Sequence, residues 1–235
     1  MDIGKSFSYV LEDKDWVKKV AIGGVVTIIP ILNLVSTGYG LRVLKNVAEE
    51  RQEPLPEWDD WGGDFVKGLI LVVAGLIYAL PAIFVSGIGA IVTVVAGDTG
   101  GDLEGVAAVL MLGINCLAWI WGVLVGLWTP AAMVNYVSKG EFTAFFEFQR
   151  IWELISNNLG AYVTAIVVSI IASIAGSFGT IACVIGVIFT MFYAQIVGMH
   201  AYGQFARESG AIVGAGATLD LEPDLSLPGE PLSDL

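Results

Sequence analysis

Charged residues are scarce in this chain. Asp, Glu, Lys and Arg make up 14% of its 235 residues, while 56% are hydrophobic; a soluble domain carries about 25% charged residues. This composition excludes a chain that is disordered throughout, because disorder requires low hydrophobicity and high charge. Eleven basic residues against 23 acidic ones exclude a nucleic-acid-binding protein built on a basic face. The composition indicates an integral membrane protein that is embedded in the lipid bilayer.

Cysteine and histidine are almost absent. The two cysteines, Cys116 and Cys183, exclude a disulfide-stabilised scaffold. Together with the one histidine, His200, they provide too few of the usual ligands for a zinc site. Neither a Walker loop nor a dinucleotide-binding glycine motif occurs, and segment 175–179 resembles a serine-hydrolase Gly-x-Ser-x-Gly turn but begins with alanine. We therefore expect no metal, no cofactor, no catalytic residue and no enzyme activity.

Long segments without any charged residue predict the membrane-spanning helices. A transmembrane helix needs about 20 apolar residues. On this basis the sequence predicts four full spans, at 68–97, 105–137, 159–176 and 180–204. Pro81 lies inside the first of them and predicts a kink, because proline removes a helical hydrogen bond.

A further uncharged segment, 20–41, allows two interpretations. Pro30 and Asn33 lie in its middle, so it is either a kinked fifth span or a re-entrant hairpin that enters and leaves on one face. In the re-entrant arrangement all eleven Lys and Arg residues fall on the same side. Because positively charged loops stay in the cytoplasm, we favour four spans in the cell membrane with both termini cytoplasmic.

The segments outside the spans complete an all-α membrane helical domain over residues 1–207. Segment 141–158 places Phe145, Trp152 and other apolar residues on one side, which predicts an amphipathic helix in the membrane interface. Residues 208–235 contain acids and prolines but no Lys, Arg or aromatic residue, which predicts a disordered acidic tail. A pI near 4.3 is typical of a halophilic protein.

Small residues recur every fourth position in three of the predicted spans. Such rows allow close helix packing in lipid. They predict either tight packing within the chain or association with a membrane protein partner or a second copy. The rows comprise Ala118, Gly122 and Gly126; Ala161, Ala165, Ser169, Ser173 and Ser177; and Ala182, Gly186, Thr190, Ala194 and Gly198.

Within the loop between residues 45 and 67, residues 55–64 interleave four acids with two tryptophans. The loop is either a cation or partner site or an interfacial anchor, with tryptophan at headgroup depth and acids in water. The loop also completes an ordered set of motifs: Pro30-x-x-Asn33, Gly38-Tyr39-x-x-Arg42 and Leu55-Pro56-Glu57-Trp58-Asp59-Asp60.

With these motifs, residues 1–207 resemble an archaeal and bacterial membrane family, catalogued as domain of unknown function 4013. The resemblance implies a polytopic membrane protein without an assigned activity. It directs attention to candidate functional positions in the motifs, namely Pro30, Asn33, Tyr39, Arg42, Trp58, Asp59 and Asp60.

Three functions are compatible with this pattern. We favour a non-enzymatic membrane protein that acts through partners or by organising the membrane. A small-solute channel or permease is the first alternative, and it predicts a polar path from Asn33 through Asn115 or Gln195. A lipid-handling membrane enzyme is a weaker alternative, since the sequence offers no obvious pair of nucleophile and base.

Overall fold

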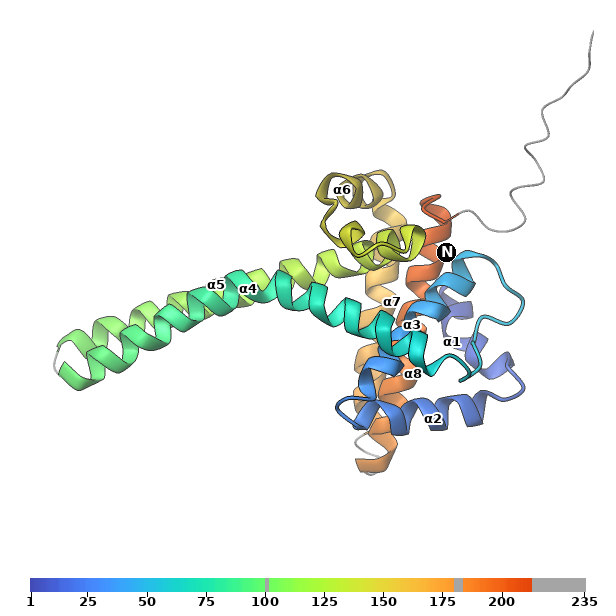
Figure 1. The fold of residues 1–235 in the computed structure, drawn as a ribbon, viewed down its shortest axis with the longest axis horizontal. Helices are drawn as coiled ribbons and strands as arrows, with labels where there is room; N and C mark the ends of the chain where they lie inside the picture. Colours follow the sequence, from blue (N-terminus) through green and yellow to red (C-terminus); the bar gives the residue numbers. More distant parts are fainter. Residues whose placement is uncertain (100–101, 180–183, 213–235) are drawn as a thin grey trace, which may run out of the picture.

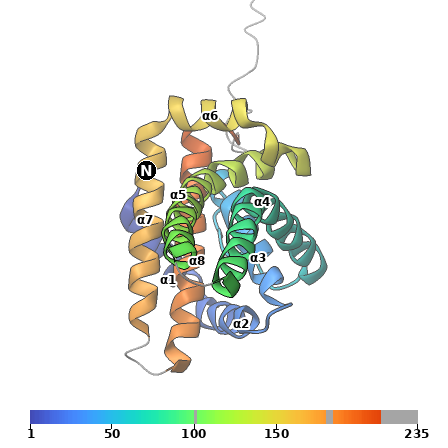
Figure 2. The same cartoon turned by 90° about the vertical axis from the view of Figure 1, so that its left-hand side faces the viewer.

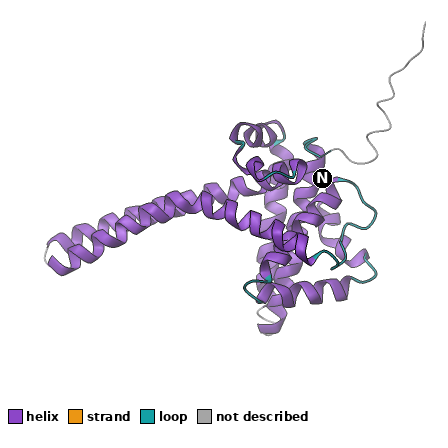
Figure 3. Ribbon diagram, in the orientation of Figure 1, coloured by secondary structure: helices purple, strands orange, loops and turns teal. Residues whose placement is uncertain are grey.

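The computed structural model describes residues 1–99, 102–179 and 184–212, and this part of the chain is helical without any β-strand (Figure 3). The expectation of an all-α fold is therefore confirmed. The elements in order are α1 (Ile3–Glu12), α2 (Trp16–Ile28), α3 (Asn33–Ala48), α4 (Trp61–Thr99), α5 (Asp102–Lys139), the 3-10 helix η1 (Phe142–Phe146), α6 (Phe148–Asn157), α7 (Leu159–Ser177) and α8 (Val184–Glu208).

The helices form a packed head and a long hairpin that projects from it. In Figure 1 the α4–α5 hairpin extends to the left of the head. The hairpin lies crosswise to the α7–α8 pair, and Figure 2 shows it end-on, in front of the head. The structure therefore differs from a compact bundle of parallel spans, since only the head is packed on several sides.

Three described helices are long and apolar enough to cross a membrane: Trp61–Val94, Gly105–Lys139 and Leu159–Ser177. They agree with the predicted spans 68–97, 105–137 and 159–176. Only 17% of the most apolar stretch of α4, and none of that of α5, is buried inside the protein. An apolar surface of this kind needs lipid around it, so the chain is a membrane protein.

Prolines do not interrupt the two long helices. Pro81 lies inside α4 and Pro130 inside α5, and both helices continue through them. The predicted kink at Pro81 therefore does not end the span, since a proline removes only one helical hydrogen bond. The predicted span 180–204 starts outside the described residues, and the number of spans, four or five, stays a prediction.

The segment 20–41 is a helix–turn–helix. α2 ends at Ile28 and α3 begins at Asn33, because Ile29 is extended (φ −80°, ψ 116°), as expected for a residue before proline. With 13 residues, α2 is about 20 Å long, too short to cross a hydrocarbon core of about 30 Å. Segment 20–41 therefore does not form one kinked helix. Whether it enters and leaves the membrane on the same face stays a prediction.

The predicted interfacial helix 141–158 is two short helices, η1 and α6, with a break at Glu147. Its apolar side chains also divide between two environments. Phe145 and Ile151 are fully buried, whereas Phe148 and Trp152 are exposed. The expected single helix was therefore wrong, while the position of the segment in the membrane interface stays a prediction. The predicted tail 208–235 lies outside the described residues beyond residue 212.

The small-residue rows have different environments. The rows of α7 and α8 face each other: a Cβ atom at Gly176 would lie 3.0 Å from the Thr190 carbonyl, and one at Gly198 would lie 3.3 Å from Ser169. In contrast, a Cβ atom at Gly122 or Gly126 of α5 would meet no atom within 4 Å. Packing within the chain thus explains the α7 and α8 rows, whereas no other described helix packs against the glycines of the α5 row.

Two glycines bring α3 and α4 into backbone contact. A Cβ atom at Gly38 would overlap the backbone of Asp64, and one at Gly68 would overlap the Leu34 carbonyl. The two contacts are reciprocal, since each helix contributes one glycine and one backbone segment. They fix the start of α4 against the middle of α3.

We expect Gly38→Ala to destabilise the head by about 1–3 kcal/mol, because overpacking a tight contact forces backbone shifts. Reversible unfolding in detergent measures this change. Gly75→Ala is the matched control, since Gly75 of α4 has open space around it and alanine favours a helix. Equal stability of both variants would contradict the tight contact.

Candidate functional site

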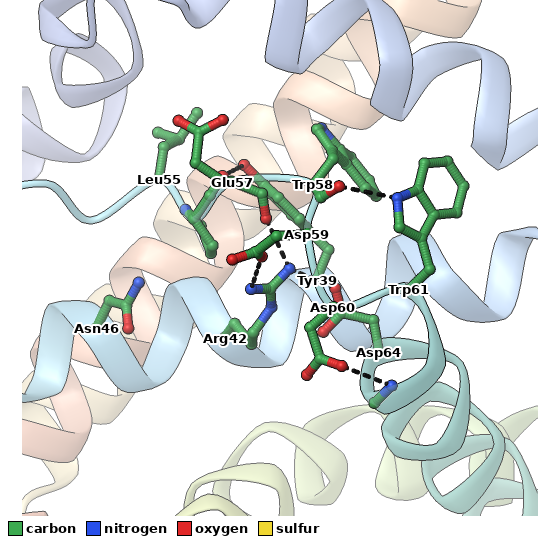
Figure 4. A network of polar contacts seen from close by, with 12 residues as sticks. Tyr39, Arg42, Asn46, Leu55, Glu57, Trp58, Asp59, Asp60, Trp61 and Asp64 are labelled. Carbon is green, nitrogen blue, oxygen red and sulfur yellow. Dashed lines mark hydrogen bonds and ion pairs between the residues drawn. The ribbon is translucent and has the colours of Figure 1, made fainter.

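Arg42 is the centre of a polar network between α3, α4 and the preceding loop (Figure 4). Its Nη1 atom donates to Asp59 Oδ1 at 2.9 Å. Its Nη2 atom donates to Asp64 Oδ2 at 2.6 Å and to the Glu57 carbonyl at 2.8 Å. One guanidinium therefore joins two carboxylates and the loop backbone.

The two carboxylates on Arg42 differ in burial. The Asp64 side chain is only 1% exposed, whereas that of Asp59 is 71% exposed. Asp64 lies in the first turn of α4, where the helix dipole favours an acid. Just before it, Asp60 Oδ1 accepts a hydrogen bond from the Gly63 amide at 2.9 Å and satisfies one of the free amides of the helix start. The α3–α4 contact at Gly38 holds Asp64 beside the guanidinium.

The charges of this network influence one another. The Arg42 guanidinium, by its hydrogen bond, lowers the pKa of the Asp59 carboxyl. Burial alone would lower the pKa of Arg42, but the hydrogen bonds that its guanidinium donates to Asp64 and Asp59 outweigh burial and raise that pKa. In the described part of the chain, Arg42 Nε and Asp64 Oδ1 are buried without a hydrogen-bond partner. The Lys67 ammonium lies 3.8 Å from that oxygen.

Tyr39 and Trp58 form the apolar side of the site. Their rings stack with centroids 4.1 Å apart and planes at 13°. The Tyr39 hydroxyl donates to the Pro56 carbonyl at 2.9 Å, and Trp58 Nε1 donates to the Lys19 carbonyl at 3.0 Å. The stacked pair therefore attaches the loop to both α2 and α3.

Lys19 is the second buried cation at this loop. Its side chain is 4% exposed, and its Nζ atom lies 2.8 Å from Asp13 Oδ2 and 2.7 Å from Glu57 Oε1. It also donates to the Leu55 carbonyl at 3.2 Å. Burial opposes its charge, but the hydrogen bonds to the two carboxylates raise its pKa overall.

The structure brings most of the predicted site residues together. Tyr39, Arg42, Trp58 and Asp59 are in the network, and Asp60 starts the adjoining helix. Pro30 and Asn33 lie elsewhere, at the α2–α3 turn, where Asn33 Nδ2 donates to the Thr27 carbonyl at 3.0 Å.

The sequence analysis missed Asp64 and Lys19 as site residues. Both stand at or near the last charged position before an uncharged segment, and that position was the available signal. The four acids among residues 55–64 each form an ion pair with a basic residue of the same chain. Glu57 pairs with Lys19, Asp59 and Asp64 pair with Arg42, and Asp60 pairs with Lys67. Among the described residues no group of three or more His, Cys, Asp or Glu could hold a metal ion.

A second buried polar cluster joins α1 to α8. His200 Nδ1 lies 3.1 Å from Ser6 Oγ, and Gln204 Nε2 donates to the same oxygen at 3.0 Å. Tyr9 stacks on the His200 ring with centroids 4.2 Å apart. This serine and histidine do form a hydrogen-bonded pair that the sequence did not reveal, but Ser6 is fully buried and lies out of reach of a substrate.

Of the predicted polar path, the structure links Asn33 with Gln195 through hydrogen bonds, but not with Asn115. Gln195 Nε2 donates to the Ser36 carbonyl at 3.0 Å, and the Ser36 and Thr27 hydroxyls are 2.9 Å apart. Because Asn33 bonds Thr27, a row of polar groups runs from Asn33 to Gln195. Asn115 belongs to α5 and bonds only within its own helix, to the Met111 carbonyl.

The helical fold with lipid-facing apolar helices defines a membrane protein, and a comparison with protein families assigns it further. A family described as "Protein of unknown function (DUF4013)" matches residues 22–185, and the chain belongs to this family. The match includes Arg42, Trp58 and Asp64 and excludes Lys19 and His200. No curated protein and no solved structure matches the chain.

We expect Arg42→Met to destabilise the protein by about 3–5 kcal/mol, because it leaves the buried Asp64 carboxylate without its main partner. The double variant Arg42→Met/Asp64→Leu should recover much of this loss, since it removes both buried charges. Unfolding free energies in detergent for the two single variants and the double variant measure the coupling.

Asp59→Asn is the matched control for this cycle. It removes the exposed carboxylate from the same guanidinium, and solvent screening makes such pairs weak. Its stability should stay close to that of the wild type. Strictly additive effects of the Arg42 and Asp64 substitutions would show that the two charges do not stabilise each other.

Proposed function

We propose that this chain is a non-enzymatic protein of the cell membrane that acts by associating with a second copy of itself within the bilayer. The observation that carries the proposal is the small-residue row of α5. Among the described residues, no atom from another part of the structure lies within 4 Å of a Cβ position at Gly122 or Gly126. Small residues at this spacing allow two helices to approach closely in lipid.

The surroundings of this row support a contact between two membrane helices. Trp119 and Leu117 are 75% and 63% exposed, so the middle of α5 is apolar as well as uncovered. An apolar cavity of about 270 Å³ lies beside the row, between Pro81 of α4 and Trp121 of α5. A second helix placed there would bury apolar surface and fill the cavity.

The polar groups of the head support a role without catalysis. The cations and acids of the Arg42 network pair with each other, and the Ser6–His200 pair is buried. These groups stabilise contacts between helices. Enzymes instead present reactive groups at an accessible cleft.

A small-solute permease is the second candidate, because the Asn33–Gln195 row of polar groups lies between α2, α3 and α8. A permease needs this row to open to solute, so Gln195→Leu would abolish uptake into proteoliposomes. In the association function the same substitution affects only the packing of α8.

The topology can be measured with single cysteines at positions 52, 100 and 149 in a cysteine-free chain, probed in intact cells with an impermeant thiol reagent. We expect labelling only at position 100, since four spans with cytoplasmic termini leave the other two positions inside. Labelling at 52 and 149 but not at 100 would mean five spans and would contradict the proposed topology.

The crosswise arrangement of the helix pairs gives this experiment a second use. The α4–α5 hairpin and the α7–α8 pair lie crosswise in the structure (Figure 1), so the labelling also tests whether both pairs cross the bilayer. A further single cysteine at position 178 would be labelled from outside together with position 100 if both pairs span.

We expect Gly122→Leu/Gly126→Leu to convert a dimer into a monomer, because the larger side chains separate the two α5 helices. Light scattering of the purified protein in detergent, together with disulfide cross-linking from position 118 in membranes, measures this change. A Cβ atom at either position meets no atom within 4 Å among the described residues.

Gly113→Leu is the matched control, since Gly113 is equally uncovered but faces the opposite side of α5. It should leave the dimer intact. A wild-type chain that is monomeric in both detergent and membranes would refute the association, and co-purification of a different membrane protein would replace the second copy as partner.

A further inference from the structure

Basic side chains surround a small cavity at the base of the hairpin. The cavity has a volume of about 280 Å³ and lies between α3, the following loop and the ends of α4 and α5. Its lining includes four basic residues, and among the described residues no carboxylate lines it. The four are Arg42, Lys45, Arg51 and Lys67.

This concentration of positive charge is unusual for the chain. Only eleven residues of the whole sequence are basic, and the net charge is −12. The carboxylate partners of these side chains lie outside the cavity: Glu49 is 3.7 Å from the Lys45 ammonium and 2.8 Å from Arg51. Asp59 and Asp64 pair with Arg42, and Asp60 pairs with Lys67, also from outside the lining. A ligand inside the cavity would therefore meet basic groups and, among the described residues, no acid, which favours an anion.

Two further observations on the lining residues fit an anion. The Nε atom of Arg42 is buried and has no acceptor in the described part of the chain, and a buried charged donor without a partner is rare. Lys45 and Arg51 are about half exposed, so their ammonium and guanidinium groups can turn toward a ligand at little cost.

The position of the cavity along the α4–α5 hairpin indicates the source of the anion. Lys67 is the last charged residue before the uncharged segment of α4, and Tyr136 lies close to the end of the uncharged segment of α5. With the hairpin in lipid, which is part of the proposed function, both mark the boundary between hydrocarbon and water. Phospholipid phosphate groups lie at that boundary, and basic pockets between helices bind anionic headgroups there.

The cavity also has an apolar side suited to the glycerol part of a lipid. Leu41 and Val137 line it together with Tyr136. A volume of about 280 Å³ is near the lower end for ligand pockets, so it accommodates a headgroup and leaves the acyl chains along the hairpin.

We propose that this cavity binds a phosphate ester of glycerol, and that the source is an anionic phospholipid of the surrounding membrane. Arg42, Lys45, Arg51 and Lys67 would contact the phosphate oxygens. Bound lipid would join α3 to the base of the hairpin and stabilise the place where the hairpin leaves the head.

The test uses the full chain in detergent, titrated with phosphatidylglycerol or with zwitterionic phosphatidylcholine and observed by native mass spectrometry. We expect retention of phosphatidylglycerol in preference to phosphatidylcholine. In Lys45→Gln/Arg51→Gln the affinity for phosphatidylglycerol should fall by about tenfold or more, since each basic side chain near an anionic headgroup contributes roughly fivefold.

The matched control is Lys18→Gln/Arg150→Gln, which removes the same two charges from exposed positions away from the cavity. It should bind phosphatidylglycerol like the wild type. Arg42 is left in place in all variants, because its pairing with Asp64 is structural. Equal binding by the test and control variants would overturn the proposal.

Soluble glycerol 1-phosphate distinguishes the two sources of the phosphate. If it does not displace phosphatidylglycerol at millimolar concentration, the lipid is the source. If it displaces the lipid and its binding depends on Lys45 and Arg51, the cavity binds phosphate as proposed but the lipid source is wrong. These results are independent of the labelling and association experiments, so failure of the membrane function would be recognised separately.

Discussion

Asp64 lies buried beside the Arg42 guanidinium because two glycines remove the Cβ atoms that would keep α3 and α4 apart. Gly38 meets the backbone of Asp64, and Gly68 meets that of Leu34. The ion pair and the close contact depend on each other: the contact places the carboxylate, and the guanidinium makes its burial tolerable. The loop that carries Trp58 and the start of the hairpin are positioned from this point.

The head and the hairpin satisfy different physical requirements. The head buries polar groups and pairs nearly all of them, so its helices are held by hydrogen bonds, ion pairs and aromatic stacking. The most apolar stretches of the hairpin are hardly buried within the protein, so lipid or another chain must cover them. The two parts meet at the base of α4 and α5, where basic residues, the end of the apolar helices and the family-matched motifs coincide.

Much of the fold and part of the site could be predicted from the sequence. Long uncharged segments identified α4, α5 and α7, since bilayer thickness dictates the length of an apolar helix. The motif residues Tyr39, Arg42, Trp58 and Asp59 proved to be neighbours. Asp64 was missed, because its importance comes from burial against α3. The sequence also did not show which apolar side chains of 141–158 pack within the protein, because periodicity does not distinguish lipid from protein as the neighbour of an apolar side chain.

The sequence by itself determined the class of protein and the positions of the long apolar helices, because hydrophobicity and charge act locally along the chain. Only the tertiary structure decided which small residues pack within the protein. The rows of α5, α7 and α8 have the same spacing, yet those of α7 and α8 close against each other while Gly122 and Gly126 remain uncovered. It also decided that the α4–α5 hairpin lies across the α7–α8 pair (Figure 1), because this arrangement depends on contacts between segments far apart in the sequence.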